Sequence, residues 1–135
     1  MVVNHTPVLP FRVQFEPGAR SYDQVVYAVK KAIISGALKP GDNFPSVRVM
    51  SQELRINPNT AQKVIAALAE ERLLIVKPGI GTVLTESAPA SHEERKALLG
   101  HDLEHVVVEA QKLRLGCDEL VQAIKQHWIR LQGKQ

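Results

Sequence analysis

The sequence predicts a mainly α-helical fold with a small β-hairpin. Aromatic residues make up only 4% of the 135 residues, so the core is expected to consist of aliphatic side chains on packed helices. Apolar residues recur at helical spacing in several stretches that open with typical capping residues. Residues 73–85 differ, because two β-rich runs there flank a turn that contains proline and glycine.

Three helices are expected before the hairpin, at residues 21–36, 46–54 and 57–72. Ser21 and Gln24 form a capping-box pattern at the start of the first helix. Asn57 followed by Pro58 is a typical start for the third. Because only two or three residues separate the second and third helices, they must cross steeply, as in a helix-turn-helix, and the hairpin that follows is a wing.

The remaining segments are an amino-terminal arm and a helical tail. The arm, residues 1–20, is expected to be irregular except for a short strand at Phe11–Phe15. Ser91 and Glu94 form a second capping box, which opens a long helix to about residue 115, and Asp118 is expected to cap a last helix. We therefore expect two domains: a winged helix-turn-helix at residues 1–86, and a two-helix hairpin at residues 87–135.

The tail helices carry apolar stripes that they cannot hide against each other alone. Each stripe needs a partner surface, and the simplest partner is a second copy of the chain. The sequence therefore predicts a homodimer. The residues expected to form its contact are Leu99, Leu103, Val106, Val107, Leu120, Ile124 and Trp128.

The net charge is +3 and the calculated pI is about 9.2, which is mildly basic. Residues 1–86 contain ten Lys and Arg against seven Asp and Glu, whereas residues 87–135 contain seven of each. All excess positive charge therefore lies in the predicted winged domain, where a nucleic-acid surface would be needed.

The sequence also indicates a cellular compartment. The single cysteine, Cys117, cannot form an internal disulfide and is expected to be a small buried residue. Residues 1–15 are interrupted by prolines and do not resemble a signal peptide, and no apolar run approaches the roughly 18 residues that span a bilayer. We expect a cytoplasmic protein without membrane contact.

Enzyme chemistry is not indicated. The chain has no phosphate-binding glycine loop, no nucleophile elbow and no paired acidic motif, so no catalytic residue and no cofactor is expected. His101 and His105 lie one helical turn apart, a spacing that can bind zinc or nickel, but no clear ligand set accompanies them and no metal site is assigned.

The motifs from about residue 21 to residue 85 resemble those of the GntR family of bacterial transcription regulators. The matching segments are Tyr22-Asp23-Gln24, Ile34-Ser35-Gly36, Pro40-Gly41-Asp42, Asn57-Pro58-Asn59-Thr60 and Pro78-Gly79-Ile80-Gly81-Thr82. The short tail and the Asn-Pro-Asn-Thr start of the third helix resemble the YtrA-like subgroup. That resemblance implies a repressor, often of operons that contain ABC-transporter genes.

Three positions depart from the family pattern. Arg72 stands where a glycine is usual, and Phe44 stands where a leucine is usual. Gln62, followed by Lys63, stands where many members carry arginine. The last departure concerns the helix that reads DNA, so it bears on the operator sequence.

The resemblance and the residue chemistry together predict the DNA-binding residues. Asn and Gln side chains pair with adenine and Lys with guanine, and the start of the third helix offers such groups on its polar side. The resemblance implies a DNA contact at the start of the second helix and a wing tip in the minor groove. The expected residues are Arg48, Asn59, Thr60, Gln62, Lys63, Lys77, Gly79 and Gly81.

The predicted function is that of a regulator, most simply a homodimeric repressor of a palindromic operator on double-stranded DNA. Two alternatives stay open at this point. One is a protein-interaction module that uses the winged fold without DNA. The other is a sensor of an unidentified small-molecule effector or a metal, with its ligand site in the carboxyl-terminal helices.

Overall fold

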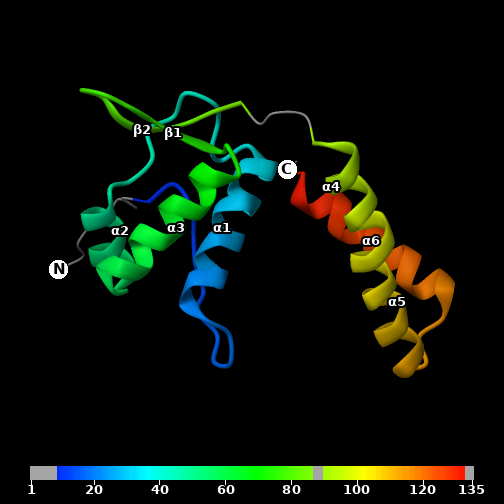
Figure 1. The fold of residues 1–135 in the computed structure, drawn as a ribbon. Helices are drawn as coiled ribbons and strands as arrows, with labels where there is room; N and C mark the ends of the chain where they lie inside the picture. Colours follow the sequence, from blue (N-terminus) through cyan, green and yellow to red (C-terminus); the bar gives the residue numbers. More distant parts are fainter. Residues whose placement is uncertain (1–8, 87–89, 133–135) are drawn as a thin grey trace. The chain divides into compact units, whose positions relative to one another are not determined.

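A computed structural model describes residues 9–86 and 90–132, which form two compact units on either side of residues 87–89 (Figure 1). The first unit contains α1 (Ser21–Ser35), α2 (Val47–Leu54), α3 (Pro58–Glu70), β1 (Leu74–Lys77) and β2 (Gly81–Leu84). The second contains α4 (His92–Ala97), the π-helical η1 (Leu98–Asp102), α5 (Leu103–Lys112) and α6 (Cys117–Leu131). This architecture confirms the mainly α-helical fold class with a small hairpin.

An aliphatic core holds the first unit together. α3 packs against both α1 and α2, and β1 follows directly from its end (Figure 1). The largest fully buried side chains come from all three helices: Val25, Val29, Met50, Val64 and Leu68. Because α3 is held on its apolar side by two other helices, its polar side is left uncovered by this unit.

The start of α1 differs from the expected capping box. The helix begins at Ser21 itself, with Arg20 at the cap position and no side-chain cap bond. Gln24 is therefore one residue too far along to form the box. Its amide instead donates to the backbone oxygens of Glu16 at 3.2 Å and Ala19 at 2.9 Å, and its Oε1 accepts from the Glu16 N–H at 2.8 Å. Gln24 thus holds the turn that precedes the helix.

The strand expected at Phe11–Phe15 is absent, because the described arm has no regular structure there. Phe11 is buried and stacks on Phe44, with ring centroids 5.8 Å apart and planes 12° apart, whereas Phe15 is exposed. The free edge of β2 is already paired with residues 41–44, where the Phe44 N–H donates to the Thr82 oxygen at 2.8 Å. That edge of β2 is therefore not open to the arm, and Phe44 provides the stacking partner of Phe11.

α3 ends in a left-handed turn at Arg72, the position where a glycine was expected. The Leu73 N–H donates to the Leu68 oxygen and the Arg72 N–H to the Ala69 oxygen, both at 2.9 Å, which is the bonding of a Schellman motif. Arg72 has a φ of +65°, a conformation that glycine adopts without the steric cost borne by other residues.

Arg72→Gly is therefore expected to raise the free energy of unfolding of the first unit by about 0.5–1 kcal/mol. Urea denaturation followed by circular dichroism measures this change. Arg72→Ala is the matched control, because it removes the same side chain but keeps the Cβ atom. Equal stability of the glycine and alanine variants would contradict the role given to the left-handed backbone.

The second unit begins with the expected capping box. The Ser91 Oγ accepts from the Glu94 N–H at 3.0 Å, and the Ser91 N–H donates to the Glu94 Oε1 at 2.8 Å. The predicted cap of the last helix is wrong: α6 is capped by Gly116, whose N–H donates to the Glu119 Oε1 at 3.3 Å. Asp118 lies inside the first turn of that helix.

The second unit buries very little apolar surface. Ala110 is the one buried residue among those described in this unit, and Cys117 is exposed, contrary to the expectation of a buried cysteine. The exposed large apolar side chains of this unit are Leu98, Leu99, Leu103, Val106, Val107, Val108, Leu113, Leu115, Val121, Ile124, Trp128 and Ile129. The helical hairpin on its own therefore leaves many large apolar side chains in contact with water, which is unfavourable.

The residues that the structure describes include no helix with the length and apolar character needed to cross a membrane.

Candidate DNA-binding surface

The first turn of α3 is fixed by its own sequence. Asn57 caps the helix, because its Oδ1 accepts from the Asn59 N–H at 2.7 Å, and Pro58 occupies the first helical position. The apolar side of α3, with Ala61, Val64 and Leu68, lies in the core. The structure therefore leaves the predicted base-reading side chains Asn59, Gln62 and Lys63 exposed, and Thr60 half-buried.

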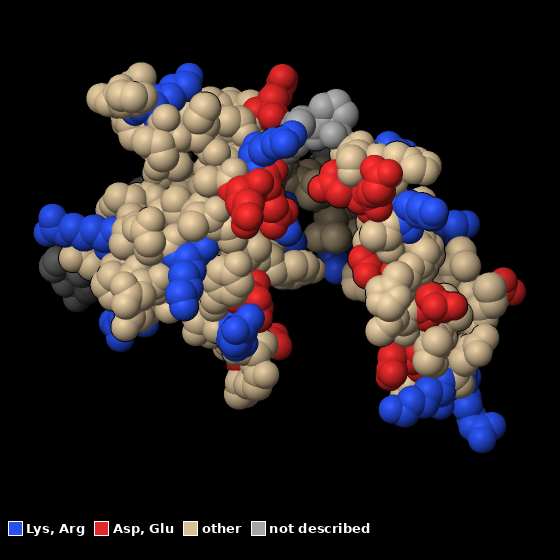
Figure 2. Space-filling model, in the orientation of Figure 1, with Lys and Arg blue, Asp and Glu red and all other residues tan. Residues whose placement is uncertain are grey.

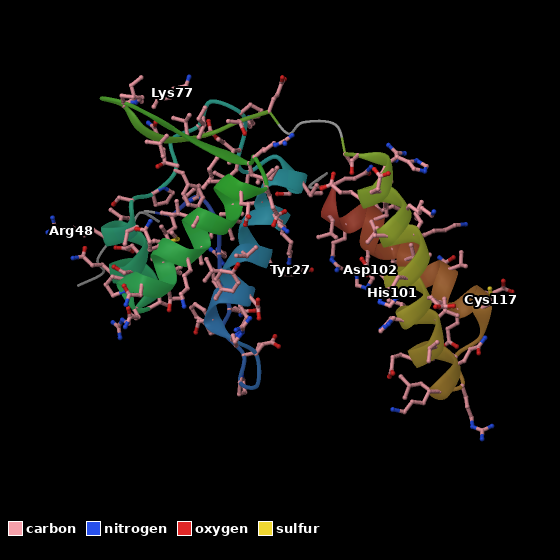
Figure 3. All side chains as sticks on the ribbon, in the orientation of Figure 1. Tyr27, Arg48, Lys77, His101, Asp102 and Cys117 are labelled. Atoms are coloured by element: carbon pink, nitrogen blue, oxygen red, sulfur yellow. The ribbon has the colours of Figure 1, made fainter. Side chains whose placement is uncertain are left out.

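Arg48 lies in the first turn of α2. Ser46 caps this helix, since its Oγ accepts from the Val49 N–H at 3.1 Å. Met50, two positions beyond Arg48, is fully buried, which fixes α2 against the core and turns Arg48 outward. Figure 3 shows Arg48 projecting from α2 and Lys77 projecting from the hairpin, each away from the core.

The hairpin ends in a tight turn at the other predicted contact residues. β1 and β2 pair from Leu74–Leu84 to Lys77–Gly81, and the Ile80 N–H closes the turn on the Lys77 oxygen at 3.0 Å. Pro78 followed by Gly79 is a typical sequence for a type II turn, and the φ of +80° at Gly79 fits the third position of that turn. Gly79 and Gly81 (φ +116°) therefore both serve the turn, and Lys77 is exposed beside them.

The predicted contact side chains are not engaged within the protein. In residues 9–86 and 90–132, the side chains of Arg48, Gln62, Lys63 and Lys77 form no hydrogen bond or ion pair, unlike Lys30, which binds Glu71 at 2.9 Å. Figure 2 shows basic side chains spread over the α2–α3 side of this unit, with acidic ones in this view nearer α1 and the end of α3. Unpaired cations are available for phosphates.

One basic residue near this surface was missed from the sequence. Thr60 and Lys63 line an open depression whose other wall is the start of α1, including Arg20 and Tyr22. The Arg20 guanidinium lies 5.8 Å from the centre of the Tyr22 ring and pairs with Asp23 at 3.2 Å. No local pattern marks Arg20, because its proximity to Lys63 arises only when α1 packs on α3.

Two helices joined by a short turn, with an unengaged polar side on the second and a hairpin behind it, define the winged helix class of DNA-binding proteins. Residues 21–84 match the family described as bacterial regulatory proteins, gntR family. Together with the 30% identity to a regulator described below, this match shows that the chain belongs to the GntR family, and the resemblance in its motifs is confirmed.

Two relatives match more than four fifths of the chain. The HTH-type transcriptional repressor YtrA of Bacillus subtilis is 28% identical over 117 residues, which are 84% of this chain and 90% of YtrA. The HTH-type transcriptional regulator YhcF of the same organism is 30% identical over 112 residues, 83% of this chain and 93% of YhcF. The expected likeness to YtrA is therefore confirmed.

A solved structure shares the fold of most of the chain. The protein described as a transcriptional antiterminator from Listeria monocytogenes superimposes with a TM-score of 0.81 over 92% of this chain and 93% of its own, at 21% identity. Such a likeness concerns the fold alone. From its family, this protein is a DNA-binding transcription regulator and not an enzyme.

Proposed function

We propose that this regulator is a cytoplasmic repressor that binds a palindromic operator as a homodimer. Each copy would place its α3 in the major groove, with the two grooves one helical turn apart. The observation that carries this proposal is the exposed, unengaged polar side at the start of α3. Kinship with a repressor, YtrA, supports repression, and the YtrA-like pattern supports a transporter operon as the target.

The contact residues are proposed to divide into two roles. Asn59, Gln62 and Lys63 read base edges, because amides pair with adenine and ammonium groups with guanine. Arg48 and Thr60 bind phosphates and fix the position of α3 along the duplex. Such phosphate contacts carry no sequence information. The division follows from position and exposure: Arg48 is exposed but lies on α2, the helix that crosses the DNA backbone in this motif, and Thr60 on α3 is half-buried.

The edges of the surface add further proposed contacts. The wing tip, which contains Lys77, Gly79 and Gly81, is proposed to lie in the neighbouring minor groove. Glycine there allows the backbone to approach the DNA closely. Arg20 adds a phosphate contact beside Lys63, because both line the same depression.

The tail is proposed to hold the two copies together. Six of the seven predicted contact residues are exposed and Leu120 is half-buried; Leu99 and Trp128 are each 69% exposed. Burial of such side chains against a second copy gains about 25 cal/mol for each Å² of apolar surface removed from water. The proposed contact residues remain Leu99, Leu103, Val106, Val107, Leu120, Ile124 and Trp128.

Selection of bound sites from random duplexes tests the proposal directly. We expect an inverted repeat whose half-sites are centred about 10 base pairs apart. A single unrepeated site would remove the palindrome and the dimeric arrangement. An absence of salt-dependent duplex binding would instead favour the alternative of a protein-interaction module.

Arg48→Ala is expected to weaken binding to all duplex sequences alike, because Arg48 is assigned to a phosphate. Each lost phosphate contact reduces the slope of log K against log salt concentration by about 0.9, and the dimer loses two, one in each half-site, so a reduction of about 1.8 is expected. Fluorescence anisotropy at several salt concentrations measures both quantities. Lys125→Ala, which removes a cation from α6, is the control with an unchanged slope, and an unchanged slope for Arg48→Ala would refute the phosphate role.

A further inference from the structure

Two histidines on the tail helix face each other across one helical turn. The ring centroids of His101 and His105 are 4.5 Å apart, the planes are inclined by 61°, and both residues are exposed. Figure 3 shows His101 projecting from the middle of this helix. Neither ring has a hydrogen-bond or ion-pair partner in the described ranges, whereas the His127 Nδ1 lies 2.7 Å from the Arg130 guanidinium. The pair is therefore free to bind a ligand.

The separation of the two rings fits chelation of one metal ion. Zinc binds imidazole nitrogen at about 2.0 Å, which places each ring centre about 3.2 Å from the metal. Two such bonds at an angle of about 90° put the ring centres about 4.5 Å apart, and a tetrahedral angle puts them about 5.2 Å apart. The observed 4.5 Å lies at the lower end of this range, so side-chain rotation alone can bring both rings onto one ion.

The backbone conformation and the local charge also favour a metal site at this histidine pair. His101 lies in the π-helical turn η1 and His105 lies in α5, so the pair spans the junction between the two kinds of helix. Single π-helical turns are rare in proteins, and those that do occur are often found at functional sites. Asp102 and Glu104 lie between the two histidines in sequence and add negative charge that attracts a cation.

We propose that His101 and His105 chelate one divalent late transition-metal ion, of the zinc, nickel or copper class. Imidazole is a preferred ligand of these ions. The described residues contain no cluster of three or more metal-binding side chains, so the proposed site consists of these two imidazoles, with water at the other positions of the ion. Binding requires the folded helix with its π turn, so the ion stabilises the tail.

Isothermal titration of the full-length protein, purified without a histidine tag, with zinc chloride and with nickel chloride tests this site. We expect saturable binding of one ion per protomer. His101→Ala and His105→Ala are each expected to lower the affinity at least tenfold, because one of two ligands is lost. His92→Ala is the matched control, since His92 is also exposed on the tail but outside the pair.

Saturating zinc is also expected to raise the melting temperature of the wild-type tail helices and to leave that of the double alanine variant unchanged. Wild-type protein that binds neither ion saturably, or a double variant that binds like the wild type, would overturn the proposal. Neither measurement involves DNA, so failure here leaves the regulator function untouched, and failure of operator binding leaves this site untouched.

Discussion

A chain that ends at Glu86 is expected to be a monomer and to bind a palindromic operator about 100- to 10,000-fold more weakly than the full-length protein. In the dimer, binding of one half-site raises the effective concentration of the second winged unit at the other half-site. Without the tail, the two units bind independently and this gain is lost. Analytical ultracentrifugation and anisotropy with the selected operator measure the two effects.

The truncation is informative because the first unit contains its own core. The buried cluster runs from Phe11 to Leu84 and includes no residue of the tail. Binding to a duplex with one half-site should therefore be nearly equal for the truncated and full-length proteins, which is the internal control. A truncated chain that still dimerises, or that keeps full affinity for the palindrome, would remove the tail from its proposed role.

A single substitution tests the proposed dimer contact in the tail without shortening the chain. Ile124→Glu places a charge on the exposed apolar stripe of α6 and is expected to dissociate the dimer, because burial of an unpaired charge is costly. Gln126→Glu adds the same group two residues away on the opposite side of the helix and should leave the dimer intact. Dissociation by both variants would indicate unfolding of the tail and not loss of a contact.

The features that were predicted from the sequence are those determined by neighbouring residues. Ser46, Asn57 and Ser91 cap their helices through backbone groups two or three residues away, and the Pro78-Gly79 turn closes on itself. Such interactions need no knowledge of the rest of the fold. The buried side of α3 was also predicted locally, from the spacing of its apolar residues alone.

The features that were missed depend on contacts between distant segments. The stack of Phe11 on Phe44 replaced a strand, and nothing near Phe11 in sequence reveals its partner. Arg20 joins Lys63 only through the packing of α1 on α3. The exposed Cys117 was misjudged because the usual burial of cysteine assumes a filled core, which one copy of this tail does not provide.

The reading of bases by α3 leads to the second large expected effect. Gln62→Ala is expected to cost about 1–3 kcal/mol of discrimination at one base pair in each half-site, because a glutamine that pairs with both adenine N6 and N7 is lost. The fold should be unaffected, since Gln62 is exposed and its side chain forms no hydrogen bond in the described parts of the chain. The variant should bind the best site less tightly than the wild type does, and it should bind sites that are substituted at that one base pair about as tightly as the best site.

Competition binding against every single-base substitution of the selected site measures this discrimination, and Gln122→Ala on α6 is the control. The pattern of loss separates the two roles proposed on this surface. Arg48→Ala should lower all affinities together, whereas Gln62→Ala should flatten the preference at one position and leave the salt slope unchanged. Equal loss for every sequence in the Gln62 variant would assign that side chain to the phosphate backbone, and the base contacts would then have to come from Asn59 and Lys63.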